Sequence, residues 1–457
     1  MAGIGFHLKK MLDQESYFST LKAYLYSANV SSGPWIVSIL VIGLLGVIQA
    51  ENVPFQQINV FRATLIYIYA FSLIVVGLLQ MPLTRYLADL LFNKDIQMYL
   101  PAYCASLIIT GVLQGLIAIP AFFLFTDWSV NYALHAVICY LVVSFIWIAM
   151  IFVSAVKDFK TISWAFVIGG LVSVAAAHYL GRVWGPEGYL MGYTLGQFII
   201  FLVLTMRLAV EFPTNLAVNF EFLRYFKLFP TLIMIGFLYN MAIWVDKFVF
   251  WFGPTGEQVD AFLYSYTIYD APMFMAYLTI IPSLAIFLMH IETDFFQHYK
   301  GYYGAIVNKK SLATILAQKR SMVRSIMQNI RRLLKFQGVI SLIAILAVPL
   351  VITRLNLSWL SLTVLKIGIL AAFLQVLLLF LSILLLYFEF RLEALILNLM
   401  FFVLNGGLTW LTLLLGPLYY GYGYLTACFF TLLTGLILFD YKIKNLEYLT
   451  FMKQPVR

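Results

Sequence analysis

Charged residues are scarce in this chain of 457 residues. Asp, Glu, Lys and Arg together make up 11% of it, whereas roughly a quarter of the residues in soluble domains are charged. Hydrophobic residues make up 63%. This balance excludes a soluble globular domain and predicts an all-α polytopic membrane protein, because helices satisfy their own backbone polar groups within lipid.

Cysteine is also scarce, with three residues in the chain. Cys104, Cys139 and Cys428 all fall within apolar runs, and their spacing fits neither a metal site nor a redox motif. We expect free, buried thiols. The first 24 residues lack the short apolar core and the cleavage site of a signal peptide, so we expect this segment to stay on the mature protein.

Motifs for nucleotide hydrolysis and catalysis are absent. The sequence has no G-x-x-x-x-G-K-[ST] phosphate-binding loop, no H-E-x-x-H pair and no G-x-S-x-G turn, and its five histidines are scattered. We therefore expect no ATP-driven pump, no catalytic residues, no bound metal and no cofactor.

Long apolar runs are abundant. At about 20 apolar residues per crossing, we predict twelve transmembrane helices. Those of the first half lie near 24–48, 61–82, 101–125, 131–156, 161–181 and 188–206, and those of the second half near 228–252, 261–289, 336–353, 362–388, 392–415 and 420–439. An even number of crossings places both termini on the same side of the membrane.

Basic residues concentrate in alternate connections, which is the pattern of cytoplasmic loops. Of 29 Lys and Arg residues, 24 lie on one side of the predicted spans, whereas only Arg182 and Arg354 lie on the other. We therefore expect both termini in the cytoplasm. The net charge of +9 mostly reflects this topology, so we expect no nucleic-acid partner.

The polar connection at 207–227 is the expected boundary between two six-helix bundles. We predict a cytoplasmic segment at 1–23, an N-terminal bundle at 24–206, a C-terminal bundle at 228–440 and a cytoplasmic tail at 441–457. Because six crossings return the chain to the cytoplasm, the two bundles have the same orientation, as parallel transporter repeats do.

Four polar side chains interrupt two predicted spans of the second half. Asn240, Asp246 and Lys247 lie in the run 229–252, and Asp270 lies in the next run. A charge within a bilayer costs roughly 2.5–3.5 kcal/mol on insertion scales, so such groups usually face a protein interior or a wet cavity. Adjacent helix positions diverge by about 100°, so we expect the partners of Asp246 and Lys247 to come from other helices. The alternative is that Lys247 reaches the membrane surface and both aspartates are structural.

Tyrosines are frequent around these groups, among them Tyr266 and Tyr269. Aromatic faces can stack on the C–H surfaces of sugars, while hydroxyls and carboxylates accept hydrogen bonds from sugar hydroxyls. We therefore place both tyrosines with Asn240, Asp246, Lys247 and Asp270 along a substrate path. The alternative for the tyrosines is the aromatic belt that most membrane proteins carry at the interface.

Gly33 and Pro34 interrupt the first predicted span. A proline inside a helix removes an amide donor and clashes with the preceding turn, so we expect a kink that can serve as a gate. A static kink filled by a neighbouring helix is the alternative.

A basic amphipathic helix is predicted at 311–335. Its apolar residues recur at helical spacing, and Arg320, Arg324 and Arg331 are among its charges. Such a helix either lies on anionic lipid or docks a cytosolic partner, and the sequence leaves both open.

The opening MAGIGF at 1–6 and the SSGPW at 31–35 resemble the start of the PelG family of exopolysaccharide transporters, and the length and twelve-span plan agree over the whole chain. This family belongs to the polysaccharide branch of the multidrug and oligosaccharide flippase superfamily. The resemblance implies two six-helix bundles around a central cavity. It also implies three partners, namely the glycosyltransferase PelF, the cyclic di-GMP receptor PelD and the membrane protein PelE.

Three functional hypotheses follow. The first is an inner-membrane transporter, not an enzyme, that moves a growing amino-sugar-containing polysaccharide outward, driven by polymer extension or by an ion gradient. The second is a cation-coupled small-molecule antiporter with Asp246 and Asp270 as exchangeable ion sites. The third is an intramembrane glycosyl- or acyltransferase.

Overall fold

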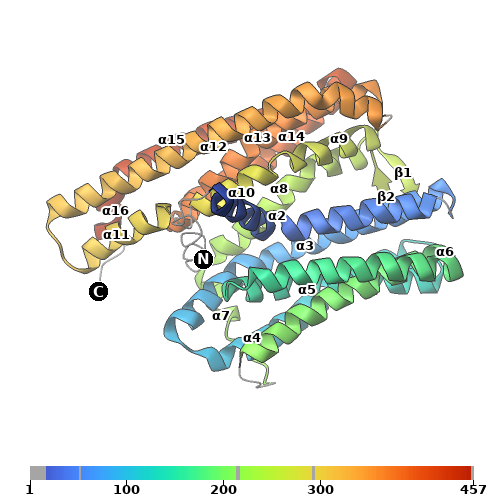
Figure 1. The fold of residues 1–457 in the computed structure, drawn as a ribbon, viewed down its shortest axis with the longest axis horizontal. Helices are drawn as coiled ribbons and strands as arrows, with labels where there is room; N and C mark the ends of the chain where they lie inside the picture. The colour runs from blue at the N-terminus through green and yellow to red at the C-terminus, as the bar shows by residue number, and fades with distance from the viewer. Residues whose placement is uncertain (1–16, 51–52, 213–216, 291–293, 356, 454–457) are drawn as a thin grey trace. The chain divides into compact units, whose positions relative to one another are not determined.

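The computed structural model describes residues 17–50, 53–212, 217–290, 294–355 and 357–453. Long helices dominate these residues (Figure 1). By packing, the chain divides into two compact units, called here the first unit (Gly33–Tyr266) and the second unit (Met1–Ser32 with Thr267–Arg457). The segment 1–6, which carries part of the family resemblance, lies outside the described residues.

Helix α2 (Tyr17–Ala50) contains the boundary between the two units. The other elements of the first unit are α3 (Phe55–Asn93), η1 (Ile96–Met98), α4 (Tyr99–Leu124), α5 (Val130–Ala155), α6 (Phe159–Glu211), α7 (Leu223–Leu228), α8 (Pro230–Trp251), β1 (Glu257–Asp260) and β2 (Leu263–Ser265). Those of the second unit are α9 (Thr267–Leu278), α10 (Ile281–His290), α11 (Phe296–Val307), α12 (Leu312–Arg354), α13 (Trp359–Tyr387), α14 (Arg391–Leu415), η3 (Pro417–Tyr419), α15 (Tyr422–Lys444) and α16 (Leu446–Lys453).

Eleven helical segments of the described residues are long and apolar enough to cross a membrane. One of them, α6, is two helices joined at Gly185, whose φ of 59° breaks the helical backbone just before Pro186. The Ser173 hydroxyl donates a hydrogen bond to the Tyr193 carbonyl at 3.2 Å, so the two arms fold back on each other. Counting the arms separately gives the twelve predicted crossings.

Glycines allow the two arms of α6 to pack closely. A Cβ atom on Gly192 or Gly196 would collide with the backbone of the opposite arm. At their far ends, the Arg207 Nε donates to the Asp158 carboxylate at 2.5 Å, and Asp158 also accepts a hydrogen bond from the Thr161 amide. Burial opposes ionisation of Asp158, but these hydrogen bonds outweigh it and lower the pKa of its carboxyl.

The hydrophobic core of the first unit lies among α3, α4, α5 and α6. Helix α8 packs against α3, where Gly77 and Gly236 let the two backbones meet. The packing units therefore divide the chain at Ser32/Gly33 and Tyr266/Thr267 rather than at 207–227. The predicted domain boundaries at 1–23, 24–206, 228–440 and 441–457 stay predictions.

The eighth predicted span, 261–289, begins later than expected. Strands β1 and β2 form an antiparallel hairpin in which Gln258 pairs with Tyr264. The Tyr67 hydroxyl ties this hairpin to α3, because it accepts a hydrogen bond from the Tyr264 amide at 2.9 Å and donates one to the Tyr264 carbonyl at 3.1 Å. The membrane-crossing helix then starts at Thr267 and is interrupted between α9 and α10, around Thr279.

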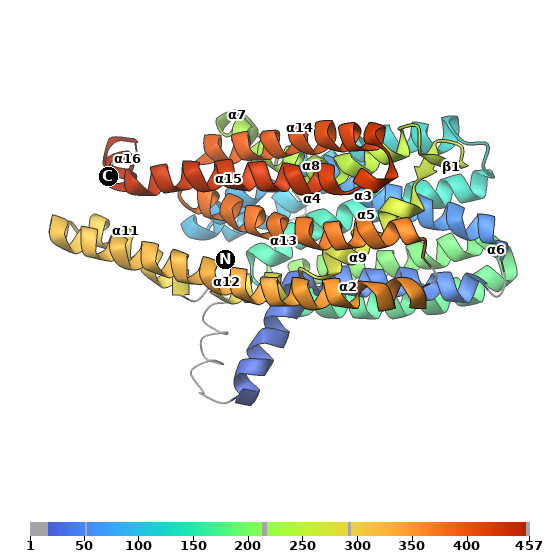
Figure 2. The ribbon, with the colours of Figure 1, turned by 90° about the horizontal axis from the view of Figure 1, so that it is seen from above.

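Helix α12 joins two elements that the sequence predicts separately. The amphipathic segment 311–335 and the span 336–353 form one continuous helix of 43 residues. Its first part runs beyond the end of α13, and α11 lies alongside it (Figure 2). The second unit therefore carries a helical extension. It consists of α11, α16 and the first part of α12.

Candidate functional site

The charged residues of α8 pair with each other. Asp246 is fully buried, and the Lys247 Nζ donates to both of its carboxylate oxygens, at 3.0 and 2.8 Å. Nζ also donates to the Ile243 carbonyl at 3.0 Å. The expectation that adjacent helix positions keep these two groups from pairing is wrong, because the long lysine side chain folds back along the helix and cancels the angular offset of the two Cβ atoms. Further partners from other helices stay a prediction.

Asn240 connects α8 to α3. Its side-chain amide donates to the Leu73 carbonyl at 3.1 Å and lies beside Gly77, where α3 and α8 cross. Asn240 is buried, so it serves the helix contact. A carboxamide here satisfies one backbone acceptor without introducing a charge.

Aromatic rings line the contact between α3 and α8. Tyr67 stacks on Trp251 with ring centroids 5.0 Å apart, and Phe71 stacks on Phe248 at 5.3 Å. Tyr266, predicted to lie on the substrate path, is buried and stacks on Phe250 at 5.7 Å. These rings pack the protein interior along α8.

The remaining two predicted path residues belong to the second unit. Tyr269 is fully buried, and Asp270 is half-buried in the first turn of α9. A carboxylate is favourable there because the helix N-terminus carries a partial positive charge. Asp246 and Asp270 thus lie in different packing units, and a shared cavity stays a prediction.

Gly33 and Pro34 lie at the boundary between the two units. The structure keeps α2 helical across them, and the Ser38 hydroxyl donates to the Pro34 carbonyl at 3.0 Å. The change of packing unit falls between Ser32 and Gly33. The kink and the gate at Gly33 and Pro34 stay predictions.

The helical extension presents a basic surface. Arg320, Arg324 and Arg331 are exposed on α12. Of its apolar residues, Met322 and Ile326 are buried, whereas Leu312, Met327 and Leu334 are exposed. Protein therefore covers part of the apolar face, and both contact with anionic lipid and docking of a partner stay predictions for this helix.

Two ion pairs hold the extension together. Lys319 Nζ lies 2.5 Å from the Glu447 carboxylate, linking α12 to α16. Asp294 lies 3.5 Å from the His290 ring and 3.4 Å from the Arg332 guanidinium. Hydrogen bonding to His290 lowers the pKa of the Asp294 carboxyl, burial opposes this, and the charge of Arg332 adds to the lowering.

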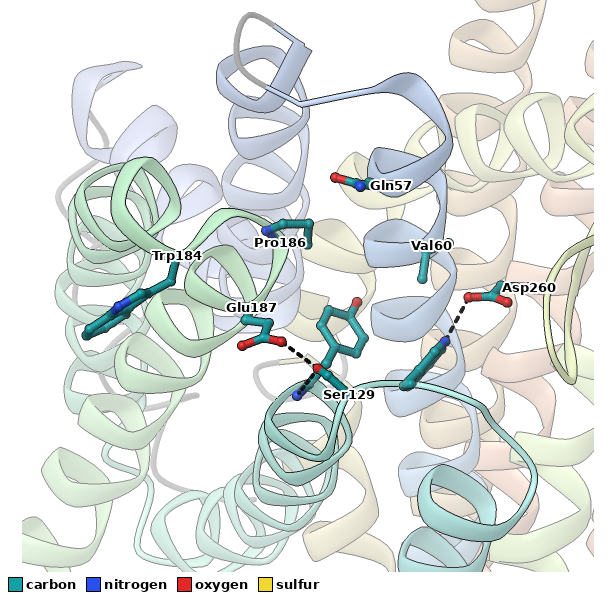
Figure 3. Close-up of a pocket in the computed structure, with 9 residues that line it drawn as sticks. Gln57, Val60, Ser129, Trp184, Pro186, Glu187 and Asp260 are labelled. Carbon is teal, nitrogen blue, oxygen red and sulfur yellow. Dashed lines mark hydrogen bonds between the residues drawn. The ribbon is translucent and has the colours of Figure 1, made fainter.

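A pocket in the first unit was missed by the sequence analysis. It has a volume of about 370 Å³ and lies where the starts of α3 and α5, the turn of α6 and β1 come together (Figure 3). The residues that line it are Gln57, Val60, Trp128, Ser129, Tyr132, Trp184, Pro186, Glu187 and Asp260. The sequence gave only a weak indication of this pocket. Its polar and aromatic residues lie in connections that the predicted topology places on the outer side of the membrane. Among the described residues, no group of three or more His, Cys, Asp or Glu is placed to hold a metal.

The sequence matches a protein-family model over almost its whole length. Residues 1–451 match the family model described as "PelG: Putative exopolysaccharide Exporter (EPS-E)". The chain belongs to the PelG family. A comparison with curated protein sequences finds no match.

Solved structures show the fold of this PelG-family chain. It is similar to an outward-facing multidrug resistance MATE family transporter of the MOP superfamily, with a TM-score of 0.68 and 13% identity over 93% of this chain and 96% of that one. A MOP superfamily transporter from Pyrococcus furiosus gives 0.67 and 13% over 93% and 96%, and an inward-facing MATE transporter gives 0.63 and 13% over 89% and 95%. Transporters of this fold have twelve helices in two bundles, which confirms the predicted fold class. The PelG-family chain is a multi-pass membrane transporter.

Proposed function

We propose that this PelG-family chain moves a growing, amino-sugar-containing exopolysaccharide from the cytoplasm outward across the inner membrane. The observation that carries the proposal is the family match over 1–451, because the family is described as exopolysaccharide exporters. The transporter fold supports it. Since the sequence contains no phosphate-binding loop, the driving force is polymer extension by a partner enzyme or an ion gradient.

The buried pair on α8 has a framework role in this proposal. A fully buried carboxylate that is held by Lys247 has no surface to offer a hydrated polymer, so Asp246 fixes the shape of α8 instead of touching sugar. Asp270 is half-buried and is therefore the better candidate for substrate contact among the predicted path residues.

A cation-coupled small-molecule antiporter is the second candidate. It is favoured by the likeness to structures described as multidrug resistance transporters. Cells that lack the chain, complemented with it, separate the two functions. Restored secretion of polymer with unchanged efflux of cationic dyes supports the exporter, whereas restored dye efflux without polymer supports the antiporter.

The exposed arginines of α12 are proposed to dock a cytoplasmic PelF-like glycosyltransferase, with PelD-like and PelE-like proteins as membrane partners. Reversing Arg320, Arg324 and Arg331 together to Glu should lower copurification of the glycosyltransferase at least tenfold, because an acidic partner surface would then be repelled. Copurification measured from solubilised membranes tests this.

Reversal of Arg354, which is exposed at the opposite end of α12, is the matched control and should leave the complex intact. Normal membrane insertion of the triple variant must be verified by its yield in the membrane fraction. If the complex survives triple reversal in full, the basic surface binds anionic lipid headgroups and the docking proposal is wrong.

Replacing Pro34 by Ala should restore a helical amide and stiffen α2 at the boundary of the two units. We expect polymer secretion to fall several-fold at normal protein levels, measured by secreted polymer per cell. Pro120, which lies inside α4 of the first unit, supplies the control, since Pro120→Ala changes a helical proline away from this boundary. Equal secretion by both variants would make the α2 proline purely structural.

A further inference from the structure

One membrane-crossing helix of the second unit is broken in its middle. Helix α9 ends and α10 begins within the single crossing segment Thr267–His290. At the break, the Thr279 amide donates to the Ala276 carbonyl at 3.1 Å. The Ile280 amide donates to the Tyr277 carbonyl at 3.3 Å. Both bonds span three residues instead of four, and such a tight turn inside a long helix often marks a functional hinge.

The break removes the usual donors from two backbone carbonyls. In a continuous helix, the Leu278 carbonyl would accept from residue 282 and the Thr279 carbonyl from residue 283. Residue 282 is a proline, which has no amide hydrogen to donate. Because lipid offers no donors, a carbonyl freed in this way must find a partner on a neighbouring helix.

Gln337 of α12 supplies that partner. Its Nε2 donates to the Thr279 carbonyl at 3.3 Å, and its Oε1 accepts a hydrogen bond from the Ser283 hydroxyl of α10. Nε2 also donates to the Ser341 hydroxyl, one turn further along α12, at 3.1 Å. Gln337 and Ser283 are both fully buried. One carboxamide thus holds the break and the start of α10 together, with a donor and an acceptor each used in the correct sense.

The two halves of the broken helix rest on different neighbours. Helix α9 packs mainly against α13, where Gly368 lets the backbone approach Met273 and Ala276. Helix α10 packs mainly against α12. A change of angle at the break would therefore move α10 while α9 stays in place on α13.

We propose that Thr279 and Ile280 form a hinge of the second unit, and that Gln337 is the positioning residue that holds the hinge in the bend described here. Opening the bonds of Gln337 to Thr279 and Ser283 frees α10 to turn against α9. This proposal goes beyond the proposed function, because it concerns how the unit moves, whatever the substrate. It assigns a role to a residue outside the predicted path and outside the predicted gate.

Hydrogen exchange of the full-length protein in lipid nanodiscs, read by mass spectrometry, tests the positioning role. Gln337→Met keeps the length of the side chain but removes all three of its hydrogen bonds. We expect the amides of 280–285 to exchange at least about tenfold faster, because a buried acceptor loses its donor and the break opens more often.

Gln375→Met is the matched control. Gln375 is a buried glutamine on α13 of the same unit, and its Oε1 has no hydrogen-bond partner among the described residues. This variant should exchange like the natural protein over 280–285. Unchanged exchange in Gln337→Met, or an equal increase in Gln375→Met, would overturn the positioning role of Gln337.

Pro282→Ala distinguishes a hinge from a static break. The new amide can donate to the Leu278 carbonyl, so α9 and α10 can join and the hinge stiffens. We expect exchange over 280–285 to slow about tenfold and polymer secretion to fall several-fold at normal protein levels. A static break predicts normal secretion from a variant that gains a hydrogen bond, and that result with slowed exchange would overturn the hinge. Only the secretion measurement rests on the proposed function. Exchange needs no polymer, so the proposed function can fail while this proposal stands.

Discussion

Replacing Lys247 by Met is expected to destabilise the folded protein by about 3–5 kcal/mol, the range measured when one partner of a buried ion pair is removed. The Asp246 carboxylate is fully buried, and the side chain of Lys247 is only 10% exposed, so solvent screens the pair little. The variant leaves the carboxylate in place without this ammonium. Unfolding of purified protein in detergent, followed by tryptophan fluorescence, measures the loss.

The double variant Asp246→Leu/Lys247→Met is the control, because it removes both charges together. Replacing a buried pair by apolar residues of similar volume is often close to neutral, so the double variant should recover most of the stability. Asp246→Asn keeps size and hydrogen-bond acceptance but removes the charge that Lys247 pairs with, so the framework role predicts a loss of stability for this variant as well. If Asp246→Asn lost secretion but kept the stability of the natural protein, the Asp246 charge would act in transport. If Lys247→Met unfolded like the natural protein, the framework role would be wrong.

Gly236→Leu is expected to separate α8 from α3 and to lower the yield of folded protein severely. A Cβ at this position would collide with the Gly77 carbonyl, and a backbone carbonyl cannot move aside as a side-chain end can. Overpacking a core costs about 1–3 kcal/mol or more, and here it also disturbs the nearby Asn240 contact to Leu73. Size-exclusion profiles of solubilised protein report the loss.

Gly43→Ala provides the comparison, because among the described residues no atom beyond its chain neighbours and the adjacent turns of its own helix lies within 4 Å of the position its Cβ would take. It should leave the profile unchanged or slightly improve stability, since Ala costs less conformational entropy in a helix than Gly. A normal profile for Gly236→Leu would show that α8 and α3 pack differently from the arrangement described here.

Local patterns of apolar residues predicted where the long helices lie. The runs on either side of Gly185 and Pro186 predicted both arms of α6, because a long apolar helix needs no partner to be recognised. The spacing of Ile315, Met322 and Ile326 likewise predicted the amphipathic part of α12. The spacing could not show what each apolar residue contacts. In α12, protein covers Ile315, Met322 and Ile326.

Tertiary arrangement explains the remaining errors. The angular argument for Asp246 and Lys247 considered Cβ directions and ignored the reach of a lysine side chain, which closes the pair. The pocket is lined by both Glu187 and Asp260, although their positions differ by 73 in the sequence numbering. Such convergence leaves no periodic trace in a single sequence.

Translocation of polymer into sealed membrane vesicles tests the central claim most directly. Inverted vesicles containing the chain would be supplied from outside with the partner glycosyltransferase and labelled activated sugar. Their product would then be treated with a membrane-impermeant glycoside hydrolase. An outward exporter predicts that labelled polymer accumulates inside, resists the hydrolase and becomes digestible when detergent opens the vesicles. Polymer that is equally digestible in vesicles with and without the chain would contradict transport of the polysaccharide by this protein.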